Sequence, residues 1–279
     1  MVVRVNKEKA IAEKYAADFP LLMTIWGIAG PSIWLALWPL IYFGYMPLWV
    51  GGIIATIIMA YTYLPCHEAE HGNIGRPNSR LRWLNELIGH ANGFIITLPY
   101  SLHRTMHMKH HAYTNEPGKD PDTFMSADNV WQALRKGVDS LQPGRPTFIN
   151  VDVLDDTPKS KQLILEAFFI LTLTWAGITL LAWTGFALEV LILWWLPSRI
   201  AGIYIMVTQA WFPHHPGTET GRYRSTQGRK IPFGLVLTGG MEYHLVHHLF
   251  PTIPLNRTPA AYRELKPLLK EKGMELNNL

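Results

Sequence analysis

Eight of the twelve histidines in this sequence form three short clusters, each beside a long apolar stretch. The clusters have the spacings HxxxH, HxxHH and HxxHH and consist of His67 and His71, of His107, His110 and His111, and of His244, His247 and His248. On a helix, positions i, i+3 and i+4 lie on one side, so each cluster can direct its imidazoles at one small volume. Imidazole is the commonest metal ligand and suits iron, copper, zinc and nickel. Because eight imidazoles are too many for one ion, we predict a site for two metals.

The first cluster also fits another kind of site. Residues 67 to 71 read HEAEH, which satisfies the HExxH pattern of zinc peptidases with Glu68 as the general base. A peptidase of that kind needs one zinc and three protein ligands, so both HxxHH clusters would have no role. A membrane zinc metalloprotease is therefore a remote alternative. A third alternative is a membrane protein that binds metal or lipid but catalyses no reaction, and such a protein would consume no O2 when its metal is reduced.

The elements that position these histidines are expected to be membrane helices. Of all residues, 48% are hydrophobic and only 16% are charged, and the chain has 11 Trp and 11 Tyr. Apolar runs lie at about 21–43, 47–65, 163–186 and 187–211, each near the roughly 20 residues that cross a bilayer. We predict an all-α integral membrane fold with four transmembrane helices in two hairpins, formed by a single domain over residues 1–279.

The distribution of basic residues predicts the orientation. Every Lys and Arg except Arg199 lies before the first apolar run, within 66–162 or after 211, and the hairpin linkers have none. The positive-inside rule therefore places both termini and all histidine clusters in the cytoplasm, with 66–162 and 212–279 forming a helical cap. The first twenty residues have no apolar core, so no cleavable signal peptide is expected. The net charge of +4 then indicates anionic lipid as a partner and not nucleic acid.

Some polar or reactive residues inside apolar stretches need their own interpretation. The run from Leu84 to Tyr100 contains several polar residues and lies between two clusters on the same side, which predicts an interfacial or re-entrant segment. Arg199 should face protein, water or a ligand. The lone Cys66 excludes an internal disulfide and Cys-based zinc or iron–sulfur sites, and we expect a packed thiol. His90 and His103 are expected to pack beside the site and not to bind metal.

Four stretches together resemble a known family, the integral-membrane fatty-acid desaturases and hydroxylases, which share histidine boxes with the β-carotene ketolases and hydroxylases. The resemblance runs from about Pro65 to Pro254. It rests on HEAEHG at 67–72, HMKHHAYTNEPGKDPDTF at 107–124, WFPHHP at 211–216 and EYHLVHHLFPTIP at 242–254. What it implies is a bundle of four transmembrane helices whose cytoplasmic cap holds two iron ions, ligated by the eight clustered histidines.

The resemblance also implies further site residues. One more histidine ligand is expected after the fourth helix; His214 or His215 could fill this role, and WFPHHP favours His214, with His215 then beside the ligands. Asp120 and Asp122 of the DPD sequence either orient imidazoles, as carboxylates near metal sites often do, or form an Asp-Pro turn. Glu242 stands where relatives often carry Asn or Gln, and it could hydrogen-bond a ligand imidazole or bind iron itself; direct ligation is not expected.

The activity that the resemblance implies is an O2-dependent oxidation of an unactivated C–H bond of a lipid by a di-iron oxidoreductase. The TNEPGKDPD stretch resembles acyl desaturases, so a fatty-acyl desaturase is the first expectation. WFPHHP and the small size resemble lipid or carotenoid hydroxylases and ketolases, which are the alternative. The chain has no flavin or nicotinamide fingerprint, so an external electron donor such as a ferredoxin, a rubredoxin or a cytochrome b5-like protein is expected on the basic cap.

Overall fold

The computed structural model describes residues 2–140, 150–274 and 276, and over these residues the chain is built from helices and turns without a β-strand. Three helical segments are long and apolar enough to cross a membrane: α2 (Leu21–Tyr42), α3 (Leu48–Glu70) and the continuous stretch Pro158–His214. This confirms the all-helical, membrane-capable class. Residues 141–149, which belong to the predicted cap, lie outside the described residues.

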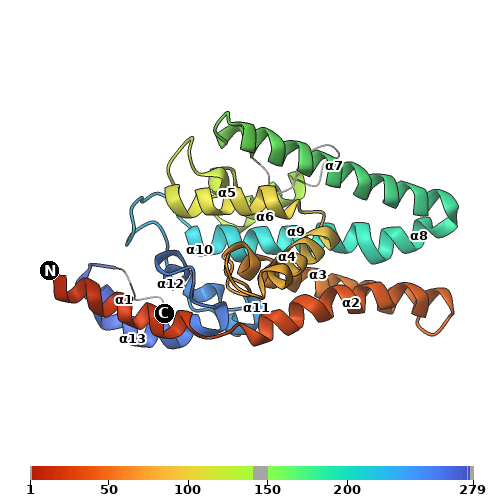
Figure 1. Ribbon diagram of the computed structural model, residues 1–279. Helices are drawn as coiled ribbons and strands as arrows, with labels where there is room; N and C mark the ends of the chain where they lie inside the picture. Colours follow the sequence, from red (N-terminus) through yellow and green to blue (C-terminus); the bar gives the residue numbers. More distant parts are fainter. Residues whose placement is uncertain (1, 141–149, 275, 277–279) are drawn as a thin grey trace.

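The third segment reverses direction near its middle. Gly185 has φ of 103°, a left-handed value that glycine adopts without a steric penalty. Figure 1 shows that the chain runs out along α7 and returns along α8, α9 and α10. The reversal lies next to the break predicted at 186/187. The parts of this segment are α7 (Pro158–Leu181), η3 (Ala182–Phe186), α8 (Ala187–Val190), η4 (Leu191–Trp195), α9 (Leu196–Ile205), η5 (Met206–Trp211) and α10 (Phe212–His214).

Helix α3 lies at the centre of the long helices, against α2, α9 and the shorter α4 (Arg82–Ile95). Close approach depends on small residues, as in other membrane helix pairs. A Cβ on Gly51 would lie 2.4 Å from Ile41, and one on Gly52 would lie 2.7 Å from Ile192. In contrast, α2 and α7 expose large apolar side chains on their outer faces, for example Leu35 and Phe168. Such faces are suited to contact with lipid.

The predicted interfacial run forms α4 and then, after a turn, α5 (Tyr100–Tyr113). Helix α4 has 14 residues and is too short to cross a bilayer. Its inner face is tied to the long helices, because Asn85 donates to the carbonyl of Ala69 and Asn92 donates to that of Gly27, at 2.9 and 2.8 Å. Its outer face exposes Trp83. Helix α5 begins directly after this turn and contains the second histidine cluster, so the anchoring of α4 helps to position these histidines.

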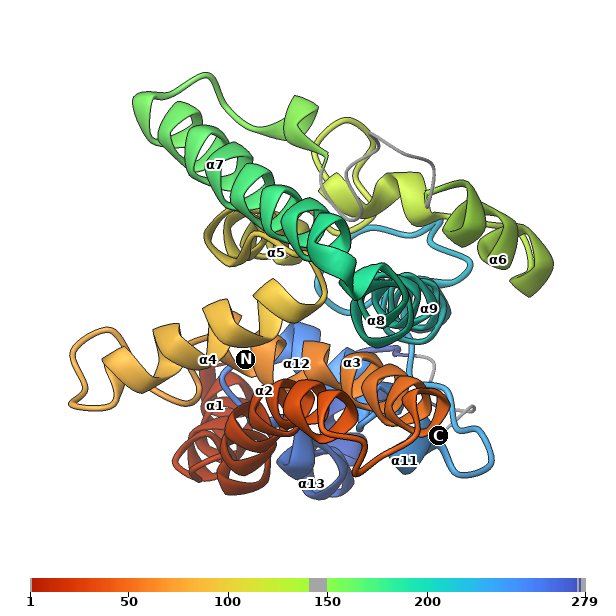
Figure 2. The same ribbon diagram turned by 90° about the vertical axis from the view of Figure 1, so that its right-hand side faces the viewer.

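The remaining elements gather at one end of the long helices, where α12 approaches the ends of α3, α5 and α10 (Figures 1 and 2). Helices α1 and α13 lie side by side there, joined by an ion pair of 2.5 Å between Lys14 Nζ and Glu264 Oε1. These elements are α1 (Val2–Ala16), η1 (Pro121–Met125), α6 (Val130–Asp139), η2 (Val151–Val153), α11 (Gly234–Leu237), η6 (Met241–Tyr243), α12 (His244–Leu249), η7 (Leu255–Arg257) and α13 (Thr258–Glu271).

Candidate metal centre

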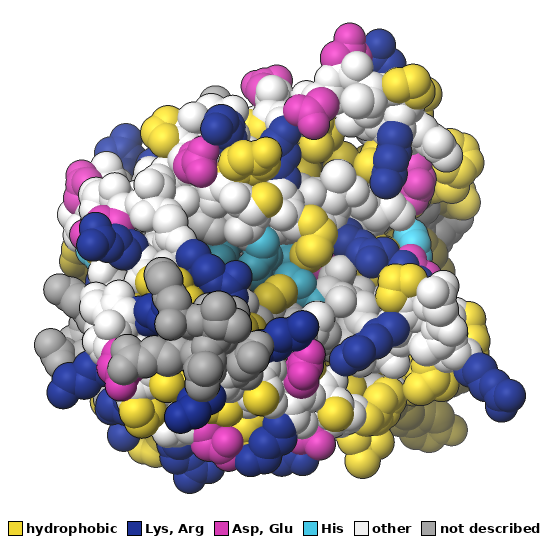
Figure 3. Space-filling view, turned by 60° about the vertical axis from the view of Figure 1, so that its left-hand side comes forward, with side chains coloured by type: hydrophobic (Ala, Val, Ile, Leu, Met, Phe, Trp, Pro, Cys, Tyr) yellow, Lys and Arg dark blue, Asp and Glu magenta, His cyan; other side chains and the backbone are white. Residues whose placement is uncertain are grey.

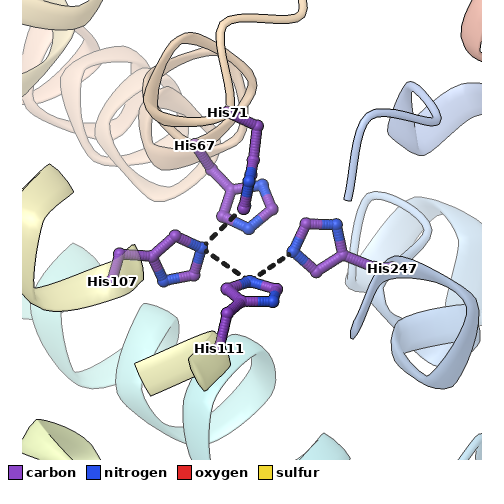
Figure 4. A group of neighbouring side chains, drawn as sticks. All are labelled: His67, His71, His107, His111 and His247. Atoms are coloured by element: carbon purple, nitrogen blue, oxygen red, sulfur yellow. Dashed lines mark hydrogen bonds between the residues drawn. The ribbon is translucent and has the colours of Figure 1, made fainter. Parts of the chain in front are cut away.

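The nine histidines predicted as ligands converge into two groups at this end of the molecule. Within each group the nitrogen atoms that face one another all lie within 4.8 Å. Figure 4 shows the first group, with rings from α3, α5 and α12 pointing at a common centre. The first group consists of His67, His71, His107, His111 and His247, and the second consists of His110, His214, His244 and His248.

Neighbouring residues of one helix are divided between the two groups. On α5, His111 belongs to the first group and His110 to the second; on α12, His247 belongs to the first and His248 to the second. Consecutive helical residues point about 100° apart, so adjacent histidines cannot face the same point. The i, i+4 pairs stay together, and the i+3 member turns to the other group. Two shared helices therefore hold the groups side by side.

The contacts within each group run through Nε2 atoms. In the first group, His107 Nε2 lies 2.9 Å from His71 Nε2 and 3.2 Å from His111 Nε2, which in turn lies 3.0 Å from His247 Nε2. In the second group, the Nε2 atom of His214 lies 3.2 Å from that of His110 and 2.9 Å from that of His244.

Hydrogen bonds cannot account for this arrangement. A ring nitrogen either donates one proton or offers one lone pair, so it makes a single in-plane bond. His107 Nε2 and His214 Nε2 each face two other ring nitrogens. Neither nitrogen of His67, which is 1% exposed, has a hydrogen-bond partner among the described residues. Two nitrogens bound at about 2.1 Å and at right angles to one metal lie about 3.0 Å apart, so both groups fit a bound ion.

The protonation of the rings also suits metal binding. Burial lowers the pKa of six of these histidines, and the neighbouring imidazoles lower it further. Metal ligation requires the neutral imidazole, so these rings are ready to bind near neutral pH. They are His71, His107, His111, His244, His247 and His248.

His110 differs because its Nδ1 faces carboxylates. Asp120 Oδ1 lies 2.8 Å and Asp122 Oδ2 lies 3.6 Å from His110 Nδ1. Burial lowers the pKa of His110, but the charge of Asp122 and the hydrogen bond to Asp120 outweigh it, so the pKa is raised. Burial also raises the pKa of Asp120, but the bond to His110 outweighs it, and that pKa is lowered. Asp120 further accepts the backbone N–H of Asp122 at 2.9 Å, so it both orients an imidazole and forms the turn.

Two further contacts orient rings of the second group, and sequence reasoning missed both. The Thr114 hydroxyl lies 3.2 Å from His248 Nδ1 and donates to the carbonyl of His110. Met241 Sδ lies 3.2 Å from His244 Nδ1. Contacts of this kind fix the tautomer that leaves Nε2 free for a metal. Thr114 follows His110 by four residues, so the sequence could have placed its hydroxyl on the same side of the helix as that histidine, next to the site.

A buried acid–histidine pair lies beside the first group. His103 Nδ1 lies 2.5 Å from Glu70 Oε1, and both side chains are buried. Burial lowers the pKa of His103, but Glu70 outweighs it and the pKa is raised. His103 thus packs beside the site, in agreement with the interpretation made from the sequence, whereas Glu70 had not been singled out.

Other residues considered above lie outside the two groups. The Nδ1 atom of His215 lies 3.0 Å from the carbonyl of Ala127, so of the two candidates only His214 lies among the facing rings. The Oε2 atom of Glu242 lies against Gly234 and is not part of either group. His90 is exposed and contacts the ring of Tyr100.

Two residues in the long helices have structural contacts. Cys66 is a buried free thiol, as predicted. Arg199 is buried in α9 and donates to the hydroxyl of Thr97 at 2.6 Å, so it faces protein.

Glu68 does not have the geometry of a peptidase base. Its Oε1 accepts the backbone N–H of Leu255 at 2.5 Å, and its Oε2 accepts from the amide of Asn73 at 2.7 Å. Both carboxylate oxygens are thus used to join the end of α3 to the segment after α12. The structure disfavours the metalloprotease alternative for this reason.

A cavity lies against both groups, and its remaining wall is mostly apolar. Ile96, Leu98 and Ile205 form part of this wall, together with His67 of the first group and His244 of the second. A second cavity of about 260 Å³ adjoins it and shares His110, Asp122 and His214. The first cavity has a volume of about 30 Å³, and an apolar segment that entered and widened it would lie next to both groups.

The fold is helical and membrane-capable, and its two histidine groups, each of which could hold a metal ion, lie beside an apolar cavity. The chain belongs to the fatty acid desaturase family, whose match covers residues 43–278. A beta-carotene ketolase from Paracoccus sp. is 37% identical over 75 residues, a stretch that spans 25% of this chain and 30% of the ketolase. The resemblance drawn from the histidine motifs is thereby confirmed, and with it the class of membrane desaturase and hydroxylase oxidoreductases.

Proposed function

We propose that this protein oxidises an unactivated C–H bond of a lipid with O2 at a di-iron centre. The observation that carries the proposal is the division of nine histidines into two side-by-side groups whose nitrogen contacts fit bound ions. Five imidazoles would hold one iron and four would hold the other. Iron and O2 would supply an oxidation of a C–H bond that no side-chain acid or base can perform.

The chain's own residues would orient the substrate and exclude water. Ile96, Leu98 and Ile205 offer an apolar wall beside both groups, which suits a hydrocarbon segment. Asp120 and Thr114 hold the rings of His110 and His248 with Nε2 facing the centre. Such fixed ligands and a dry cavity are what the protein contributes in metal-dependent oxidation.

We further propose that four helices cross the membrane in two hairpins, with the termini and the metal centre in the cytoplasm. The reversal at Gly185 supports two crossings within Pro158–His214, and α2 with α3 would supply the others. The exposed Trp83 on the short α4 supports a helix lying in the membrane interface. The distribution of Lys and Arg supports the cytoplasmic orientation.

An external electron donor would dock on the cap. Figure 3 shows histidine side chains at the bottom of a hollow with Lys and Arg side chains around it. Arg222 donates to the carbonyl of Leu249 in α12, and Arg229 donates to that of His215, so basic residues adjoin the histidine-bearing segments. A negatively charged ferredoxin, rubredoxin or cytochrome b5-like donor suits such a surface.

Two outcomes of the oxidation are proposed. Desaturation of a fatty-acyl chain is the reaction expected from the TNEPGKDPD stretch. The beta-carotene ketolase relative favours, as a second candidate, insertion of oxygen into a lipid or carotenoid.

Product analysis tests the proposal. Lipids would be compared by mass spectrometry in cells that express the wild type, His110→Ala or, as a matched control, His90→Ala, whose histidine is exposed and outside both groups. A lipid product that has lost two hydrogens, found in the wild type and in His90→Ala but not in His110→Ala, would show desaturation. A product that has gained oxygen with the same distribution would show hydroxylation or ketolation. Lipids that are identical in all three strains would contradict the proposal.

A further inference from the structure

Gln209 is a buried polar residue that the site described so far does not use. It lies in η5, is 4% exposed, and neither its Oε1 nor its Nε2 has a hydrogen-bond partner among the described residues. It lines the apolar cavity together with Ile205 and Ala210, and histidines of both groups line the same cavity. Its side chain, with the unpaired amide, thus adjoins the space that the lipid would occupy.

An amide in this position is unfavourable unless something binds it. Burying an amide without a hydrogen bond costs about 1–3 kcal/mol in proteins. Gln209 lies in the π-helical turn η5, and turns of this kind are frequent at functional sites. A hydrocarbon segment that filled the cavity would leave the amide unpaired, whereas a hydroxyl or carbonyl group would satisfy it.

We propose that Gln209 is a specificity-determining residue that hydrogen-bonds an oxygen substituent of the lipid close to the metal centre. The substrate class is then a lipid that carries a hydroxyl or carbonyl group near the carbon to be oxidised, and a wholly hydrocarbon segment binds less well. The inference rests on the proposed function, because it names the substrate of the same cavity. The Oε1 of Gln209 accepts from a hydroxyl, and its Nε2 donates to a hydroxyl or a carbonyl.

The neighbours of Gln209 explain why this side chain can discriminate. Ile205, Ala210 and Met241 are among the apolar residues of the same wall, and they cannot hydrogen-bond a substituent. Tyr63 and Asp122 also line the cavity. Of the polar wall residues, Gln209 alone is a neutral amide with both polar atoms buried and unpaired among the described residues. A ligand hydroxyl would therefore remove the cost of the unpaired amide.

Equilibrium binding without O2 tests the proposal and needs no turnover. Quenching of tryptophan fluorescence would give the dissociation constants of the protein in lipid nanodiscs for two matched pairs: β-carotene with a ring-hydroxylated β-carotene, and a stearoyl lipid with its mid-chain hydroxylated form. For one pair, the wild type should bind the oxygenated member about tenfold more tightly, the range of one hydrogen bond to a buried group. Gln209→Met, which keeps the size and removes the amide, should reduce this ratio to about one.

Two further variants make the result specific to the amide. Ile205→Met changes the same wall without removing a polar group, so both affinities should change together and the ratio should persist. Gln209→Asn keeps the amide but shortens it, so an intermediate ratio is expected even if Gln209→Met is poorly expressed. Two results would overturn the proposal. One is equal affinity of the wild type for the oxygenated and the hydrocarbon member, which would indicate that only water binds the amide. The other is a tenfold preference that persists in Gln209→Met. A tenfold ratio in a protein that forms no O2-dependent product would refute the proposed function and leave the role of Gln209 intact.

Discussion

His247 and His248 are neighbours in the chain, yet they face different groups of the metal centre. His247 Nε2 lies 3.0 Å from His111 Nε2, whereas His248 Nε2 lies 2.9 Å from His244 Nε2. The 100° step between consecutive helical residues turns the two rings apart. Each of these histidines would therefore bind only one of the two proposed metal ions.

Removing one of these neighbours should remove one ion. In His247→Ala the second group remains complete, and in His248→Ala the first group remains complete, so each variant should keep about one metal per chain. The pair His107→Ala with His247→Ala affects one group only and should also keep one metal, whereas His247→Ala with His248→Ala should keep none. Elemental analysis of the purified proteins checks this. Equal losses in both double variants would mean that the two groups are not separate sites.

Asp120 should make metal binding to the second group depend on pH. The pKa of His110 is raised in the folded chain, so protonation of this ring stabilises the metal-free fold. This stabilisation is complete below about pH 6.5 and is lost as the pH rises through the raised pKa. The pKa of Asp120 is lowered in the folded chain, so the charged carboxylate stabilises the fold. This stabilisation is complete above about pH 3.9 and is lost as the pH falls through the lowered pKa. A metal must displace the His110 proton, so its affinity for the second group should fall as the pH is lowered towards 6.5.

In Asp120→Asn the ring of His110 is less well oriented and less readily protonated. Metal affinity at pH 8 should fall by about 10- to 100-fold, and it should depend less on pH between 8 and 6.5. Competition with a chelator at several pH values measures both effects. Asp152→Asn, at an exposed position outside the site, is the control and should match the wild type. A steeper pH dependence in Asp120→Asn would show that this pairing has been misassigned.

Gly89 should be essential for positioning the ligands although it contacts none of them. A Cβ at this position would lie 2.3 Å from the ring of Tyr100, whose hydroxyl donates to the carbonyl of Ala69 at 2.9 Å. Gly89→Ala should displace the start of α5, lower the free energy of unfolding by about 1–3 kcal/mol and reduce the metal content. Gly177→Ala is the matched control, since nothing lies within 4 Å of its added Cβ. Thermal unfolding and metal analysis in detergent would show the contrast, and equal behaviour of both variants would argue against it.

Glu68 should matter for stability and not for catalysis. Glu68→Ala leaves the backbone N–H of Leu255 and the amide of Asn73 without their acceptor, which should cost about 1–3 kcal/mol. Glu68→Gln keeps one acceptor oxygen, so it should retain the lipid product within about threefold of the wild type. Product yield and unfolding temperature are the measurements. Complete loss of activity in Glu68→Gln with unchanged stability would instead support a general base.

The sequence was sufficient to predict the long helices and eight of the nine converging histidines, because hydrophobic length and i, i+3, i+4 spacing are local properties. His214 was expected only from the family resemblance of WFPHHP. The sequence was not sufficient to assign His110 and His111, or His247 and His248, to their groups, since that depends on how α5 and α12 are rotated about their axes. The unpaired amide of Gln209 could not be predicted either. Burial and missing hydrogen bonds are tertiary properties, and no spacing in the sequence signals them.

The number and kind of metal ions in the wild-type protein test the central claim most directly. The protein would be purified without oxygen from cells grown with iron, and its metals would be counted by elemental analysis and identified by Mössbauer spectroscopy. Two irons per chain, both lost in His247→Ala with His248→Ala, is the predicted result. A single tightly bound zinc with no iron after loading under reducing conditions would contradict it.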